Sequence, residues 1–176
     1  MIQSKVFNLQ LKISGDSNVT ELDAEILSKV KKAAFDLLNY RKRSRSELIN
    51  RLERKNFNKN YIEKTISYLE DLGYVNDNEF SKAFIRDRVR NKNIGPIAVR
   101  NEISKYNVDP EIIEESIELV YREYPVNEII SSLIKTRLDK MPMINNKEKE
   151  KMINLLKRKG FYWDDIKRNL LSNKMI

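Results

Sequence analysis

The sequence predicts an all-α protein, built from tandem three-helix repeats in an elongated, curved array. Apolar residues recur at spacings of three and four along most of the chain, which is typical of helices with one buried face. The 176 residues include only 4 Gly and 4 Pro, so long helices with short connections are expected. One set of apolar positions also returns at a fixed offset, as repeat architectures require.

The composition favours an elongated protein with a charged surface. Charged residues make up 34% of the chain and aromatic residues only 9%, which argues against one thick globule. Lys and Arg number 34 against 26 Asp and Glu, a net charge of +8. A positive field attracts polyanions, so nucleic acid or an acidic protein surface is the expected partner, unless the charge serves only solubility.

Several classes of function are disfavoured by residues that the sequence lacks. It contains no Cys and no His, which removes disulfides, thiolate and imidazole catalysis and the commonest zinc ligands. We predict no catalytic residue, no metal site and no cofactor. No apolar run approaches the roughly 20 residues that span a bilayer, and the first residues lack a signal-peptide pattern. A cytoplasmic protein without membrane contact is expected.

Residues 1–20 give an ambiguous pattern. Phe7, Leu9, Leu11 and Ile13 alternate with polar residues, which is typical of a half-buried strand. A single strand is not stable alone, and a poorly ordered terminus explains the segment equally well. A short N-terminal β segment therefore stays one of two interpretations.

The next stretch predicts three helices. A helical pattern covers Glu21–Tyr40, as one bent helix or two. Ser44 and Glu47 are spaced as a capping box, in which each side chain bonds the other residue's amide, so they start the second helix. Asn58 is the N-cap expected for the third helix. Gly73 suits the left-handed position that ends it.

The remaining helices have similar start and stop signals. Asn76 opens a second capping box with Glu79. Gly95, followed by proline, interrupts the chain, and Asp109, also followed by proline, is an N-cap with proline at the first helical position. Gly160 ends a helix before the last one begins.

The repeat appears when three stretches are aligned without gaps, at offsets of about 51 and 104 positions from the first. The matching positions are Leu52, Phe57, Ile62 and Ile66, then Ile103, Val108, Ile113 and Ile117, then Leu156, Phe161, Ile166 and Leu170. We therefore expect an N-terminal segment, 1–20, and three-helix repeats at 21–77, 78–124 and 125–176. In each, the second and third helices form a helix-turn-helix-like pair, and neighbouring repeats stack.

Four motifs then resemble one family. Residues 41–48 are similar to its R-x-R-S-x-x-E-L signature, and residues 72–80 to its L-G-Y-[IL]-[ND]-D-x-x-F signature. The Gly-Pro pair at 95–96 and the Arg-Lys-Gly-Phe run at 158–161 also match. On these residues the chain resembles the RecX family of bacterial RecA regulators. The resemblance covers about 21–172, with departures that include asparagine at position 56, where many members have glycine.

The resemblance implies a function. RecX proteins bind RecA and its filament on single-stranded DNA, lie in the filament groove, and inhibit strand exchange, ATP hydrolysis and coprotease activity. The chain would then be a monomeric regulatory protein of DNA repair, recombination and the SOS response, a RecA inhibitor without enzyme activity. The sequence has no phosphate-binding Gly-x-x-x-x-Gly-Lys-Ser/Thr motif, so such a protein could not power filament disassembly itself.

Basic residues at equivalent positions of the repeats are the candidate site for the RecA filament and DNA. They are Arg41, Lys42, Arg43, Arg45, Arg86, Arg88, Arg90, Lys92, Arg100, Arg137 and Lys140. They would face acidic surfaces of RecA or DNA phosphates, with weak, salt-dependent binding to free nucleic acid. Part of the set is explained by cations complementing helix C-termini. Gly73, Tyr74 and Phe80 are expected to pack between repeats.

Two rival classes remain open. A helix-turn-helix DNA-binding protein without RecA as partner would place Arg, Asn or Gln at the start of a recognition helix. Asn58 and Asn60 fit that class, whereas Asp109 and Glu111 would repel phosphate. A purely structural helical scaffold would show no dependence on the basic residues.

Overall fold

The computed structural model describes residues 20–139 and 145–173, and these residues contain helices and no strand. The elements are α2 (Glu21–Tyr40), α3 (Arg45–Glu53), α4 (Lys59–Asp71), α5 (Asp77–Lys92), α6 (Pro96–Ile103), the 3-10 turn η1 (Ser104–Tyr106), α7 (Pro110–Glu123), α8 (Val126–Leu138), α9 (Asn146–Arg158) and α10 (Trp163–Ser172). The all-α prediction is confirmed, and the N-terminal β segment lies outside the described residues. No helix in the described part of the chain has the length and apolar character needed to cross a membrane.

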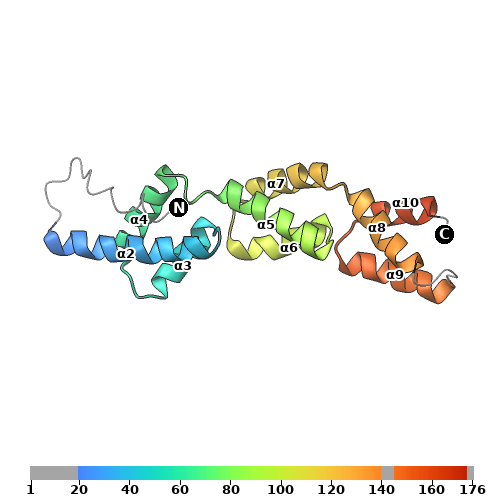
Figure 1. Cartoon of the computed structure of the whole chain (residues 1–176), viewed down its shortest axis with the longest axis horizontal. Helices are drawn as coiled ribbons and strands as arrows, with labels where there is room; N and C mark the ends of the chain where they lie inside the picture. The colour runs from blue at the N-terminus through green and yellow to red at the C-terminus, as the bar shows by residue number, and fades with distance from the viewer. Residues whose placement is uncertain (1–19, 140–144, 174–176) are drawn as a thin grey trace.

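The helices form three groups of three along one long axis (Figure 1). We call α2–α4 repeat 1, α5–α7 repeat 2 and α8–α10 repeat 3. The elongated tandem arrangement is confirmed. The stretch that allowed one helix or two is the single helix α2.

Three residues with left-handed backbone show the repeat directly. They are Asn56 (φ 62°), Asn107 (φ 48°) and Gly160 (φ 80°). Each lies in the turn before the third helix of its repeat, one residue before the aligned Phe57, Val108 and Phe161. Only glycine adopts this conformation freely, and asparagine tolerates it better than most residues. The asparagine at position 56 therefore supplies the backbone geometry that glycine gives in repeat 3.

Helix caps form at the predicted places, but the two capping boxes are only half made. Ser44 Oγ accepts the amide of Glu47 at 3.1 Å, and Asn76 Oδ1 accepts the amide of Glu79 at 3.0 Å. Both glutamate carboxylates bond cations instead of returning to the cap amide. Hydrogen bonds between two charged groups are the stronger ones, so they win this competition.

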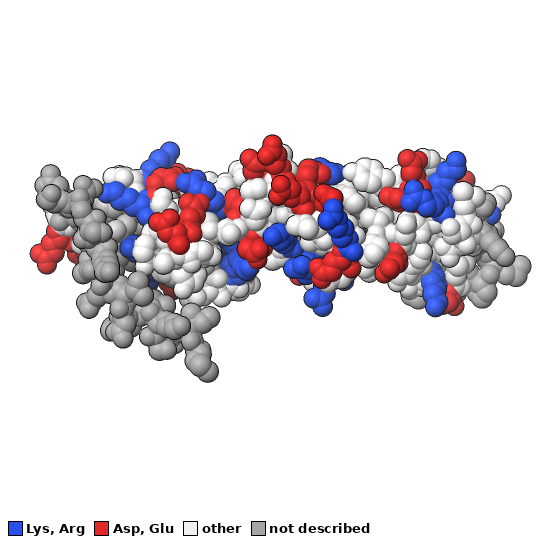
Figure 2. Space-filling view, turned by 90° about the horizontal axis from the view of Figure 1, so that it is seen from above, with Lys and Arg blue, Asp and Glu red and all other residues white. Residues whose placement is uncertain are grey.

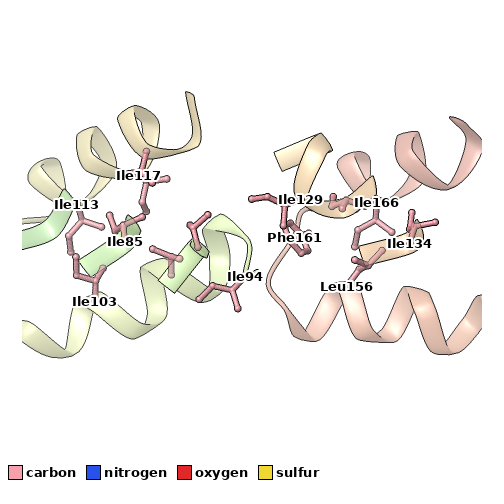
Figure 3. Close-up of a cluster of buried hydrophobic side chains, with 14 of the residues drawn as sticks. Ile85, Ile94, Ile103, Ile113, Ile117, Ile129, Ile134, Leu156, Phe161 and Ile166 are labelled. Atoms are coloured by element: carbon pink, nitrogen blue, oxygen red, sulfur yellow. The ribbon is translucent and has the colours of Figure 1, made fainter. Parts of the chain in front are cut away.

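The buried side chains form two separate clusters. Repeat 1 has its own, made of Val30, Ala34, Leu48, Leu52, Ile62, Ile66, Leu69 and Val75. The other runs through repeats 2 and 3, and includes Ile85, Ile103 and Ile117 on one side and Ile134, Leu156 and Ile166 on the other (Figure 3). Repeats 2 and 3 are therefore coupled by apolar packing, whereas repeat 1 is joined to them in another way.

Backbone contacts hold repeats 2 and 3 together. The amide of Gly95 donates to the carbonyl of Lys159 at 2.7 Å, and the amide of Ile97 donates to the carbonyl of Gly160 at 3.0 Å. A Cβ at Gly95 would lie 2.4 Å from the Gly160 oxygen, so the two backbone segments approach as closely as glycine permits. This joint depends on two glycines that meet across it.

Polar side chains hold repeats 1 and 2 together. Ser44 Oγ donates to the carbonyl of Tyr106 at 2.9 Å, and the amide of Arg45 donates to Asp77 Oδ1 at 2.7 Å. Asn107 also reaches Ser46 Oγ at 3.3 Å. This joint has side-chain hydrogen bonds where the other has backbone bonds and a shared core.

The residues expected to pack between repeats make their aromatic contacts inside a repeat. Tyr74 lies edge-on to Phe35 of α2, with ring centroids 5.3 Å apart. Phe80 contacts Tyr106 of η1 at the same centroid distance, within repeat 2. Gly73 has the expected left-handed φ of 72°. These three residues shape the chain on either side of the joint, and the polar contacts bridge it.

Candidate functional site

Most of the predicted basic residues are already paired with carboxylates. Within repeat 1 the pairs are Arg41 and Arg43 with Glu47, and Arg45 with Glu63 and Glu70. Lys42 of repeat 1 pairs with Glu79 of repeat 2. Further along the pairs are Arg86 with Glu123, Arg88 and Lys92 with Glu102, Arg100 with Glu114, and Arg137 with Glu148. Arg90 has no such partner within the described ranges, and Lys140 lies outside them.

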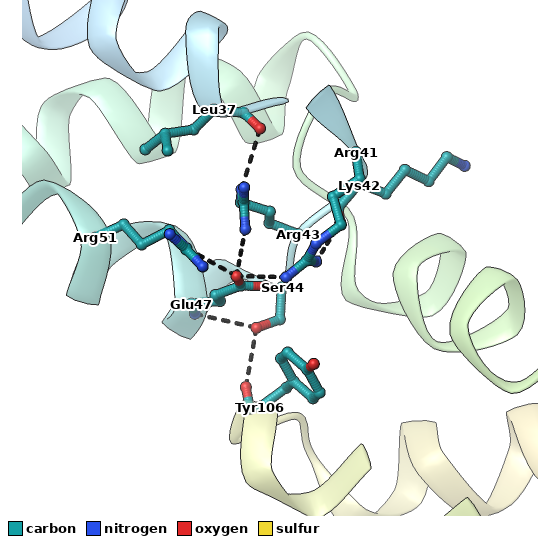
Figure 4. Close-up of polar contacts among 8 residues, drawn as sticks. All are labelled: Leu37, Arg41, Lys42, Arg43, Ser44, Glu47, Arg51 and Tyr106. Atoms are coloured by element: carbon teal, nitrogen blue, oxygen red, sulfur yellow. Dashed lines mark hydrogen bonds and ion pairs between the residues drawn. The ribbon is translucent and has the colours of Figure 1, made fainter. Parts of the chain in front are cut away.

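Glu47 is the centre of the densest group, which we call the Glu47 cluster: Glu47, Arg41, Arg43 and Arg51 (Figure 4). Its Oε1 accepts from Arg41 at 2.6 Å, from Arg51 at 2.9 Å and from Arg43. Burial acts to raise the pKa of Glu47, but hydrogen bonds from Arg51 and Arg41 outweigh it, so the pKa lies below its ordinary value. The carboxylate therefore stays charged and fixes three guanidinium groups.

Arg43 is the one predicted site residue in the described segments that is buried. Its side chain is only 5% exposed, and its Nε donates to the carbonyl of Leu37 at the end of α2. The same guanidinium bonds Glu47 on α3. Arg43 thus ties two helices of repeat 1 together and offers no free face, and we leave it out of any interface.

The other two repeats tie their first and second helices in a comparable way. In repeat 2, Glu102 on α6 accepts from Arg88 at 2.6 Å and from Lys92 at 3.0 Å. In repeat 3, Glu148 on α9 accepts from Arg137 at 2.5 Å. The recurrence of cations near these helix ends thus has a structural cause, because each set meets a glutamate of the following helix.

Charges of both signs lie close together on the surface. On the face seen in Figure 2, Lys and Arg side chains lie among Asp and Glu, without one continuous basic strip. Most basic residues of the predicted site keep part of their side chain exposed; Arg86 is 42% exposed beside Glu123. A partner could therefore still contact them, but would meet ion pairs more often than isolated cations.

Sequence reasoning missed three cations beside Arg41. Arg51, Arg54 and Lys105 line a cleft of about 250 Å³ at the joint between repeats 1 and 2. Arg51 on α3 and Arg54, the C-cap of that helix, are three positions apart, a spacing that places them on one face. Lys105 comes from η1, so only the fold brings it to the other two.

The chain is an elongated helical-repeat protein. Its three-helix repeats are joined end to end, and charged side chains near the helix ends are exposed along the row. Comparison with known proteins gives the particular family. Residues 31–69 match the model of the first RecX three-helix domain, and residues 76–117 match that of the second. The regulatory protein RecX of Prosthecochloris aestuarii is 30% identical over 140 residues, which cover 78% of this chain and 88% of that protein. The chain belongs to the RecX family.

Other relatives and solved structures agree with this assignment. RecX of Geobacillus sp. (strain WCH70) is 30% identical over 151 residues, 86% of this chain, but the match covers only 56% of that relative. The chain likewise spans about half of RecX of Bacillus subtilis, of which the match covers 50%. The crystal structure of RecX from Lactobacillus salivarius has a TM-score of 0.78 and 25% identity, covering 87% of this chain and 99% of that one. A second RecX crystal structure, at 15% identity and TM-score 0.72, shows the same fold.

Proposed function

We propose that this protein binds RecA and its filament on single-stranded DNA, and inhibits the recombinase, ATPase and coprotease activities of RecA. Membership of the RecX family is the observation that carries the proposal, together with the signature residues at 41–48 and 72–80. The elongated row of repeats supports it, because such a shape offers a long surface to a helical filament. We propose that the protein acts by binding, without an enzyme activity of its own, in the cytoplasm and as a monomer. The ranges 21–77, 78–124 and 125–176 are our proposed repeat units, with Asp77, the first residue of α5, at the boundary between the first two.

The decisive measurement is the DNA-dependent ATPase rate of RecA. The full chain is added to preformed RecA filaments at molar ratios up to one per RecA monomer. ATP hydrolysis should slow progressively over this titration. The same amount of a heat-unfolded sample is the control for non-specific effects. An unchanged rate across the titration would remove RecA inhibition from the proposal.

The cations Arg86, Arg88 and Arg90 allow a charge test, because two of them have known partners. Replacing all three with glutamine should weaken co-sedimentation with RecA filaments roughly tenfold while helical circular dichroism stays unchanged. The reverse change, Glu123→Gln, removes the carboxylate that pairs with Arg86 and leaves all the cations in place. It should leave binding equal or stronger. If it weakens binding as much as the triple variant does, the ion pairs and not the cations matter.

The DNA-binding alternative is disfavoured by the starts of the third helices. Asp109 caps α7 with Glu111 in the first turn, and the first turn of α10 contains Asp164 and Asp165. Carboxylates at these positions repel phosphate, and the Asn58 side chain is occupied as a cap by the amide of residue 60. Sequence-specific binding to duplex DNA that survives high salt would favour this alternative instead.

A further inference from the structure

The joint cleft, the hollow between α3 of repeat 1 and η1 of repeat 2, has an unusual lining. It is formed by Arg41, Ser46, Glu47, Asn50, Arg51, Arg54, Lys105 and Tyr106, and has a volume of about 250 Å³. Figure 4 shows four of these residues, Arg41, Glu47, Arg51 and Tyr106, gathered near one another. Every side chain of this lining ends in a charged or hydrogen-bonding group.

Positive charge exceeds negative charge in the joint cleft. Four of the lining residues are cations, and Glu47 is the one carboxylate among them. A single oxygen of Glu47 is already shared by Arg41, Arg51 and the buried Arg43. No described carboxylate lies within ion-pair distance of Arg54 or Lys105, the remaining two cations of the lining.

Arg43 bonds the same Glu47 oxygen, although it does not itself line the cleft. Burial is the main cause that lowers its pKa, and the charges of Arg41 and Arg51 lower it further although Glu47 opposes them. An anion bound beside Arg41 and Arg51 would offset the repulsion between these two guanidinium groups. The lining thus has four cations for one carboxylate.

We propose that the joint cleft binds a phosphate oxyanion, either free phosphate or the backbone phosphate of a nucleic-acid strand. Guanidinium groups bond phosphate oxygens in pairs, and ammonium groups bond them as point charges. Arg51, Arg54 and Lys105 supply both kinds of donor from two sides. Ser46 and Asn50 add neutral donors at the edge. This binding does not require RecA and so goes beyond the proposed function.

A phosphate in this position would also bridge two repeats. Arg51 on α3 and Arg54 at its C-cap belong to repeat 1, whereas Lys105 belongs to η1 of repeat 2. These repeats have separate apolar clusters and are joined by side-chain hydrogen bonds. Because the bound anion would be held from both sides, it would fix the angle between them.

The test is an NMR titration of the full chain, following the Nε–H signals of Arg51 and Arg54. One arm adds sodium phosphate with ionic strength held constant by sodium chloride, and the other adds a short oligothymidylate. Saturable shifts are expected in both arms. The double variant Arg54→Gln with Lys105→Gln removes two cationic donors and should bind phosphate roughly tenfold more weakly. Both side chains are exposed and make no ion pair with a described carboxylate, so the fold should be unaffected.

The control is Lys167→Gln, which removes one positive charge far from the cleft, because Lys167 is exposed on α10 in repeat 3. It should bind phosphate as the unmodified chain does. Shifts with phosphate alone would support the site and overturn the nucleic-acid source, and competition between the two additions would support that source. Absence of saturable shifts at constant ionic strength, or equal weakening by Lys167→Gln, would overturn the proposal. The ATPase titration with RecA is read separately, so neither result depends on the other.

Discussion

The substitution Gly160→Ala is expected to destabilise the protein by about 4 kcal/mol. At φ 80° an added Cβ is strained, and it would lie 2.3 Å from the Ala98 nitrogen and 2.5 Å from the Ala98 Cβ. Relieving that overlap separates repeats 2 and 3 and breaks the bond from the Ile97 amide. Urea denaturation followed by circular dichroism measures the loss. Trp163, the only tryptophan in the chain, reports on repeat 3 by its fluorescence.

Two other glycines separate the effect of backbone strain from the effect of steric overlap between repeats. Gly73→Ala should cost about 1–2 kcal/mol, because Gly73 has φ 72° but nothing lies within 4 Å of an added Cβ. Gly95→Ala should cost about 3 kcal/mol from overlap alone, since its φ of −90° suits any residue. If Gly160→Ala costs no more than Gly73→Ala, the contact between repeats contributes nothing to stability.

Local signals predicted the helices well, because they depend on neighbouring residues. The caps at Ser44, Asn76 and Asp109 start helices as expected, and the alignment of apolar positions placed the repeated turn. The separate core of repeat 1 could not be predicted in this way. From the sequence, Gly95 was interpreted only as an interruption between helices. In the fold, the position allows no side chain because Gly160 of another repeat packs against it.

The candidate site was predicted less completely, because a sequence shows charge but not its partner. Arg86 and Glu123 are far apart in the chain and meet only when α5 packs on α7. Glu47 was assigned to the cap of its own helix by spacing, yet three guanidinium groups converge on it in the fold. Lys105 was overlooked because its role depends on the joint between two repeats.

The substitution Glu47→Gln is expected to destabilise the protein by about 3 kcal/mol at neutral pH. It keeps the volume but removes the charge that compensates Arg43, whose side chain is 5% exposed. Leaving a buried charge without its partner is among the more costly single changes. Repeat 1 should unfold first, because its apolar cluster is separate from that of repeats 2 and 3. Hydrogen exchange of the α3 amides, compared with those of α7, measures this.

A matched control is Glu118→Gln, which removes a carboxylate of an exposed pair with Arg122. Such surface pairs contribute little, so a change of at most about 0.5 kcal/mol is expected. If both variants lose the same stability, the Glu47 cluster is no more than a surface pair.

The dependence on pH gives a further signature of Glu47. Because its folded-state pKa lies below the ordinary value of 4.5, its contribution is fully present above pH 4.5 and is lost as the pH falls through the folded-state pKa. The stability difference between the unmodified chain and Glu47→Gln should therefore shrink in acid, as the carboxylate of the unmodified chain takes up its proton. Denaturation curves at a series of pH values measure the difference. A gap that stays constant down to acid pH would mean that lost packing, and not lost charge, causes the destabilisation.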